Sequence, residues 1–339
     1  MSSIVDTNFI YVIYIYYMNL LPTDGGKPKL GISACLLGQK VRYDGGHKRD
    51  LFLTELFGKF VEWIPICPEI EVGMGVPRET VRLVGKLSHP RMIAEKSGTD
   101  WTEAMNRFAA KRLSDIAEKH LSGYVFKKNS PSCGMERIKV YNSKGMAERQ
   151  GRGLFAAALM SQWPLLPVEE EGRLNDLMLR ENFIERVFAY HRWLQVCSER
   201  KSPGALVRFH TSHKYLLLAH SQRQYRQLGR LVAEAKQRSL AAIYEDYGRV
   251  FMEALTVIAT EKTHANVLDH MMGYFSKQLS APERQELVQL IGDFRRQLIP
   301  LIVPITLMRH YTKKYQVEYL QGQLYLEPSP KELMLRNHV

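Results

Sequence analysis

At 339 residues with 45% hydrophobic content, the chain is long enough to bury a full core, and we expect two domains. No stretch reaches the roughly 18 to 20 consecutive apolar residues of a membrane span, so no membrane partner is expected. The formal charge of +12 favours a polyanionic partner. The four cysteines show no paired spacing, which predicts no disulfide partner and a cytoplasmic location.

The start of the chain is expected to lie outside the fold. The apolar run from Phe9 to Leu21 is short and rich in tyrosine, and it lacks the basic lead and the cleavage site of a signal peptide. Met18 offers an alternative start. We therefore predict that residues 1–27 are a disordered leader or precede the true start.

Three cysteines follow strand-like runs in the first half of the chain. Cys35 follows LGISA, Cys67 follows VEWIPI, and Cys133 follows GYVFKK and the turn residues NSPS. Each cysteine has Pro or Gly close by, which is typical of a tight loop that leaves a strand. Open α/β sheets place their ligand sites at the carboxyl ends of strands, so the three thiols are expected there.

The thiol pattern leaves two interpretations open. Three thiols cannot all pair as disulfides, and a structural zinc site normally takes a fourth N or S donor. A 4Fe-4S cluster held by three thiolates would leave one iron free of protein ligands to bind substrate. The alternative is that these cysteines, like Cys197, are buried packing residues.

The elements around these cysteines alternate between strand and helix. We predict a short strand with a glycine turn over Val41–Gly46, a helix capped by Asp50, and a helix over Thr102–Leu121. The run MERIKVYN is expected to add an edge strand, and GRGLFAAALMSQWP a further helix. The alternation predicts a three-layer α/β sandwich with a mostly parallel, Rossmann-like sheet.

From Asn175 onward the pattern becomes helical, so the second domain is expected to be all-α. The predicted helices cover Asn175–Lys201, Pro203–His220, Gln222–Lys236, Ser239–Thr260, Ala265–Leu279, Ala281–Leu298 and Pro300–Tyr311.

The start of this helical half carries most of the excess positive charge. Nine Lys or Arg residues lie between Arg200 and Arg238, against the single acid Glu234. With interleaved aromatic residues, such a segment suits phosphate contacts and stacking on RNA, although helix packing or a solvated basic face would leave the same pattern. The candidate RNA-binding residues are Arg208, His210, His213, Lys214, Arg223, Arg226 and Arg230.

The motifs ISACLLG, VRYDGG, CPE, GMGVPRE and KNSPSCG resemble those of the thiouracil desulfidase (TudS) family. The resemblance implies an iron-sulfur desulfidase domain over residues 28–170, with a 4Fe-4S cluster on Cys35, Cys67 and Cys133. It also implies that Glu69 is catalytic and that Ser130 assists it. Ser33 and Asp44 are second-tier pocket residues that either orient a cluster ligand or cap a turn.

The helical half, residues 171–339, resembles the YbgA domain through VRFHTSHKYLLLAHS, YRQLG and YLQGQLYLEPSPKEL. Fusions of the two domains resemble the RudS-type tRNA 4-thiouridine desulfidases. This implies a non-redox enzyme that hydrolyses the C–S bond of 4-thiouridine in tRNA. The alternatives are a desulfidase of free thiouracil or thionucleosides, and a non-catalytic nucleic-acid-binding protein with a structural three-cysteine metal site.

Overall fold

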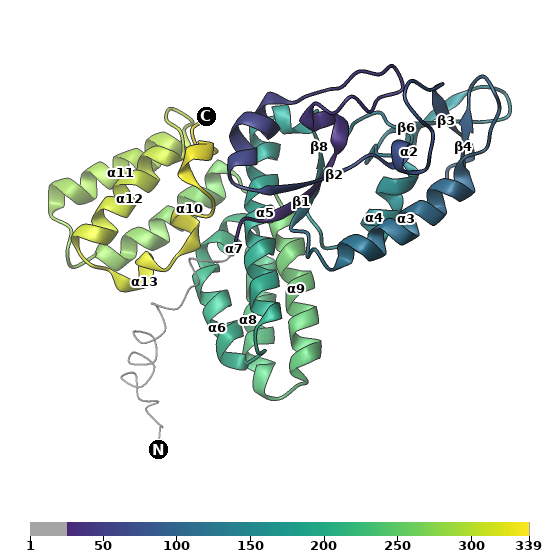
Figure 1. Ribbon diagram of the computed structural model, residues 1–339. Coiled ribbons are helices and arrows are strands. Elements are labelled where there is room, and N and C mark those ends of the chain that lie inside the picture. Colours follow the sequence, from purple (N-terminus) through teal and green to yellow (C-terminus); the bar gives the residue numbers. More distant parts are fainter. Residues whose placement is uncertain (1–25, 339) are drawn as a thin grey trace.

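The computed structural model describes residues 26–338, which form an α/β part followed by a helical part (Figure 1). The predicted leader, residues 1–27 with Met18, lies almost wholly outside the described residues. No helix within residues 26–338 combines the length and the apolar character that a membrane span requires. The predicted fold class, α/β and then all-α, is confirmed.

Four parallel strands in the order β2-β1-β5-β8 form the first sheet, called sheet A below. Strand β5 is buried at every position and β1 at all but its first, because elements cover both faces of the sheet. Strands of this kind are near-continuously apolar, which makes them visible in the sequence. The strands are β1 (Lys29–Ser33), β2 (Glu62–Ile66), β5 (Gly123–Phe126) and β8 (Val168–Glu170).

Helices cover sheet A on both sides. Tyr124 and Phe126 of β5 pack with α3 (Thr102–Ala117) and α4 (Leu154–Gln162). Val125, which points to the opposite face, packs with Phe183 of α5 (Leu177–Ser198). Sheet A is therefore the middle layer of three, and the first helix of the helical part supplies an outer layer.

A second sheet, called sheet B, has the order β4-β3-β6-β7. Its central strands β3 and β6 are parallel, and each pairs with an outer strand in antiparallel fashion. Figure 1 shows β3, β4 and β6 together at the end of the molecule away from the helices α11 (Ala281–Arg295), α12 (Ile302–Lys314) and α13 (Glu318–Gln321). The strands are β3 (Val81–Lys86), β4 (His89–Ala94), β6 (Ile138–Tyr141) and β7 (Ala147–Gly151).

Three expectations for the α/β part are wrong. The segment Val41–Gly46 forms a turn that the amide of Arg42 closes on the carbonyl of Gly46 (3.3 Å). The run MERIKVYN supplies β6, which is central in sheet B and not an edge strand. Helix α3 ends at Ala117, and His120 just beyond it takes a left-handed φ of 50°.

The cap expected at Asp50 is present, since its Oδ1 accepts the amide of Leu53 (3.0 Å). The element that follows is a π-helical turn, η3 (Phe52–Leu56), and then a 3-10 turn, η4 (Phe57–Lys59).

The helical part contains most of the predicted helices, with one break. The helix expected over Pro203–His220 is interrupted at His213, where φ is −95° and ψ is 3°. After α5, the helices are α6 (Pro203–Ser212), α7 (Lys214–His220), α8 (Gln222–Ala233), α9 (Leu240–Thr256), α10 (Glu261–Met272), α11 (Ala281–Arg295), α12 (Ile302–Lys314) and α13 (Glu318–Gln321).

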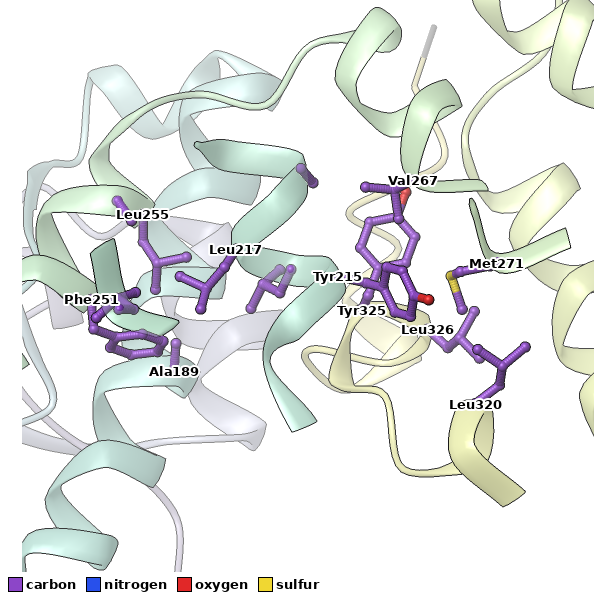
Figure 2. Close-up of a cluster of buried hydrophobic side chains, with 14 of the residues drawn as sticks. Ala189, Tyr215, Leu217, Phe251, Leu255, Val267, Met271, Leu320, Tyr325 and Leu326 are labelled. Carbon is purple, nitrogen blue, oxygen red and sulfur yellow. The ribbon is translucent and has the colours of Figure 1, made fainter. Parts of the chain in front are cut away.

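Helix α7 lies at the centre of the helical core (Figure 2). On one side, its Leu217 faces Phe251 and Leu255 of α9. On the other side, its Tyr215 faces Met271 of α10 and Tyr325 of the C-terminal segment. The break at His213 gives α7 the direction it needs to pack against both groups.

The C-terminal segment is tied back to α5 by buried charges. The guanidinium of Arg336 donates to Glu185 Oε1 (2.6 Å) and to the carbonyl of Tyr325 (2.5 Å). Glu185 Oε2 lies 3.1 Å from Nε2 of His220 on α7. Since α5 also covers sheet A, these contacts join the tail, the helical core and the α/β part.

Candidate active site

Three thiols meet around one cavity at the carboxyl edge of sheet A. Cys35 follows β1, Cys67 follows β2, and Cys133 lies in the loop after β5. These strands are neighbours in the order β2-β1-β5, so parallel pairing brings their ends to the same edge. All three cysteines line a cavity of about 410 Å³, a size typical of small-molecule sites.

Burial keeps these thiols protonated when no cation is bound. It raises the pKa of Cys35 to about 11, and it raises the pKa values of Cys67 and Cys133 as well. The hydroxyl oxygen of Ser132 lies 3.6 Å from the Cys133 sulfur. A metal or cluster bound here would displace the thiol protons, because the ligand form of cysteine is the thiolate.

The loop of Cys133 is held by the N-terminus of α4. The first free N–H groups of a helix need acceptors, and here loop carbonyls supply them. Leu154 N donates to the carbonyl of Pro131 (3.1 Å), and Ala156 N donates to that of Ser132 (3.1 Å). Gly153 permits this approach, since a Cβ there would lie 2.5 Å from the Ser132 carbonyl.

Glu69 faces the cavity from α2 (Pro68–Glu71), with partners on both carboxylate oxygens. Arg78 donates to Oε2 through Nε (3.2 Å) and Nη2. Ser132 donates to Oε1 at 2.7 Å, and Ser130 does so at 3.3 Å. The ion pair is largely buried, with 14% of the Glu69 side chain and 6% of the Arg78 side chain exposed.

The carboxylate that caps the start of α2 is that of Glu71, and not that of Glu69. Its Oε1 accepts the backbone N–H of Cys67 (3.1 Å), and its Oε2 lies 3.3 Å from Arg112. This contact satisfies a free amide at the start of α2. The carboxylate of Glu69 therefore has no capping role and faces the cavity.

Sequence reasoning missed the importance of Ser132 and Arg78. Ser130 is expected to assist Glu69, but Ser132 makes the shorter bond to the carboxylate. Ser130 also accepts the amide of Cys133 (3.1 Å), so it shapes the cysteine loop. The motifs SPSCG and GVPRE contain both missed residues, but spacing does not reveal that they meet at one carboxylate.

The two second-tier residues lie in different surroundings. Ser33 is buried, lines the cavity, and accepts the amide of Lys127 (3.0 Å). Asp44 is exposed and accepts the amide of Gly46 (3.0 Å) within its own turn. It does not contribute to the lining of the cavity among the residues that the structure describes.

Two family models match different parts of this chain. The model for 2-thiouracil desulfurase covers residues 30–171, which include all three cavity thiols and Glu69. The model DUF1722, a protein of unknown function, covers residues 214–330. The curated protein YbbK of Bacillus subtilis (strain 168), described as uncharacterized, is 33% identical over 43% of this chain and 98% of its own length. The chain belongs to the 2-thiouracil desulfurase family.

Two further relatives extend the comparison. The uncharacterized protein YbgA of Escherichia coli (strain K12) is 37% identical over 45% of this chain and 90% of its own length. A solved structure of a [4Fe-4S]-dependent thiouracil desulfidase, TudS, is 32% identical over 45% of this chain and 97% of that chain, with a TM-score of 0.37. The family model and the YbgA match show that the chain joins a 2-thiouracil desulfurase region to a YbgA-like region.

In the helical part of the chain, the predicted RNA-binding residues separate into two groups. The arginines at 208, 223, 226 and 230 are exposed, and the last three share one side of α8. His213 is buried and bonded to the Phe209 carbonyl (2.8 Å), and burial lowers its pKa to about 3. His210 stacks on Tyr225, and Lys214 lies over the rings of Tyr215 and Tyr319.

Proposed function

We propose that this desulfurase uses an iron-sulfur cluster to remove sulfur from 4-thiouridine in tRNA, with uridine and sulfide as products. The observation that carries the proposal is the meeting of three buried thiols and one oriented carboxylate around a single cavity. The family match supports a thiolated pyrimidine as the reacting group. Free 2-thiouracil is the second candidate substrate, favoured by the description of that family.

The thiol set suits a polynuclear cluster. Within residues 26–338, no group of three or more His, Cys, Asp or Glu side chains is placed to hold a single metal ion. A cluster distributes its cysteines over different irons, so its ligands lie farther apart than the donors of one ion. Held by Cys35, Cys67 and Cys133, a 4Fe-4S cluster would keep one iron free of protein ligands and supply a soft Lewis acid for the thiocarbonyl sulfur.

Glu69 is the group that we assign to proton transfer. Arg78 donates to one carboxylate oxygen and fixes its position, while the serine hydroxyls orient the other. Glu69 accepts a proton from water as the water oxygen bonds to the ring carbon. The proton then passes to the departing sulfur as the C–S bond breaks. The second water proton leaves the new C–OH group as it becomes the carbonyl, and it completes hydrogen sulfide. Thiocarbonyl and water thus become carbonyl and hydrogen sulfide, so no external oxidant or reductant is needed.

Positive charge supports a polyanionic form of the substrate. Arg42, Lys48, Lys127 and Lys128 all line the cavity. Arg42 pairs with Asp44 (3.5 Å) and Lys127 with Glu171 (2.5 Å), whereas Lys48 and Lys128 form no ion pair with a described residue and suit the phosphates next to a thiolated nucleotide. On α8, the three exposed arginines form no ion pair with any described residue. Phosphate contacts of this kind position RNA without reading its sequence.

Cys35→Ser, Cys67→Ser and Cys133→Ser should each abolish iron and sulfide loading after anaerobic reconstitution, because each removes one of three thiolate ligands. Cys197→Ser is the matched control, since Cys197 lies on α5 among core residues of the helical part and should load normally. Loading is measured as iron and acid-labile sulfide per chain. Full loading in any of the first three variants would contradict the assignment, as would zinc in place of iron.

Glu69→Gln should lower turnover by at least about 10²-fold and leave iron content unchanged, because the amide cannot accept the proton from water. Turnover is followed as sulfide release under anaerobic conditions. Glu79→Gln is the control, since that carboxylate also lines the cavity but accepts the amides of Lys96 and Ser97. An active Glu69→Gln enzyme would show that the carboxylate is structural.

Reversing Arg223, Arg226 and Arg230 to Glu should reduce desulfuration of thiolated tRNA about tenfold or more and spare that of free 2-thiouracil, because only the polyanion needs these contacts. A triple reversal of the exposed Lys262, Lys277 and Lys331 is the control for net charge. Equal loss on both substrates would contradict the proposed role of α8. Desulfuration of thiolated tRNA at the wild-type rate by the arginine variant would also contradict it.

A further inference from the structure

Sheet B presents a face of exposed basic side chains, which the sequence analysis did not anticipate. Leu83, Met92 and Val140 point inward and are fully or almost fully buried. Alternation along the strands then sends the neighbouring residues outward. These outward residues, called the basic face of sheet B, are Arg82, Lys86, His89, Arg91, Lys139 and Arg149, all of them exposed.

The strand register aligns three of these cations in a row. Lys139 of β6 lies directly opposite Arg149 of β7. On the other side of β6, the pairing of Leu83 with Val140 places Arg82 next to Lys139. Adjacent strands are about 4.8 Å apart, so the row of three cations crosses three neighbouring strands.

The repulsion between these neighbouring cations lowers the stability of the fold, and no acidic side chain of the described residues compensates for it. Like charges directly opposite each other in an antiparallel pair are destabilising. Among residues 26–338, none of the three cations of the row forms an ion pair. Glu148 directly precedes Arg149 in β7, but it lies opposite Val140 and so points to the other face of the sheet. An external polyanion would offset the repulsion.

The face also carries a planar group and little apolar surface. The Arg82 guanidinium lies over the Tyr141 ring at 5.2 Å from its centroid, which suits contact with phosphate or a base. Within the described chain, no large hydrophobic residue of the strands of sheet B is exposed. A protein interface normally has an apolar core, so the chemistry of this face favours a nucleic acid.

Both central strands of sheet B, β3 and β6, begin at or near the cavity. Thr80 and Val81, at the start of β3, line it together with Arg78 and Glu79. Strand β6 begins at Ile138, five residues after Cys133. Figure 1 shows β3, β4 and β6 at the opposite end of the molecule from α11–α13.

We propose that the basic face of sheet B binds the phosphate backbone of the RNA whose thiolated base enters the cavity. The inference rests on the proposed function for the choice of RNA as the substrate. It adds a second contact surface to α8, and this one lies within the desulfurase part of the chain. The RNA would then be held on the strands that form the cavity wall.

The first test is a triple variant, Arg82→Gln, Lys139→Gln and Arg149→Gln, in the full-length protein. Its affinity for tRNA should fall about tenfold or more at fixed salt, and the slope of log affinity against log salt should become shallower by about 2 to 3. Turnover of free 2-thiouracil should be unchanged. The control is a triple neutralisation of Lys262, Lys277 and Lys331, which are exposed on other elements.

The second test separates binding from folding. Arg149→Glu places a carboxylate opposite Lys139, so the melting temperature should stay equal or rise, whereas RNA affinity should fall. Loss of RNA binding together with a lowered melting temperature would overturn the inference, since it would indicate damage to the sheet. Unchanged tRNA affinity in the triple variant would also overturn it. The basic face of sheet B would then have to bind another polyanion, such as an acidic protein or an anionic membrane.

These outcomes can be distinguished from failure of the proposed function. If wild-type protein binds tRNA through this face but releases sulfide only from free 2-thiouracil, the tRNA substrate is wrong and the surface is supported. If tRNA is desulfurated equally well by wild type and by the triple variant, the substrate is supported and the surface is wrong.

Discussion

The parallel pairing of β2, β1 and β5 is the constraint on which the site depends. Because these strands are adjacent and run in the same direction, the residues that follow them must emerge at one edge of sheet A. That edge receives Cys67, Cys35 and Cys133 from segments almost a hundred residues apart in the chain. Burial of sheet A on both faces by α3, α4 and α5 fixes the register and so fixes the thiols.

The carboxylate of Glu69 links two of the cysteine loops. Glu69 and Arg78 belong to the segment that follows β2, whereas Ser130 and Ser132 belong to the loop that follows β5. Removing one partner of a buried ion pair typically costs about 3–5 kcal/mol, so the network also holds the two loops together. The polar groups around Glu69 therefore serve the geometry of the thiols as well as the proposed proton transfer.

The sequence predicts the elements that are apolar and continuous, and it fails where structure depends on contacts between distant residues. The strands before Cys35, Cys67 and Cys133 were identified because buried parallel strands leave apolar runs that end in Pro or Gly turns. In sheet B the strand β6 is predicted, but Val81–Lys86 and Ala147–Gly151 are missed because they are short and polar on their outward side. The bond from Ser132 to Glu69 joins residues 63 positions apart, a meeting that no local pattern encodes.

The most direct test of the account follows the chemistry of the full-length protein, reconstituted anaerobically with iron and sulfide. It would be mixed with tRNA containing 4-thiouridine in ¹⁸O-labelled water, and released sulfide would be compared with the label in the uridine formed. Since we propose that Glu69 activates water, the account predicts equal amounts of sulfide and of ¹⁸O-labelled uridine. An iron-loaded protein that leaves 4-thiouridine intact, or that forms uridine without the label, would contradict it.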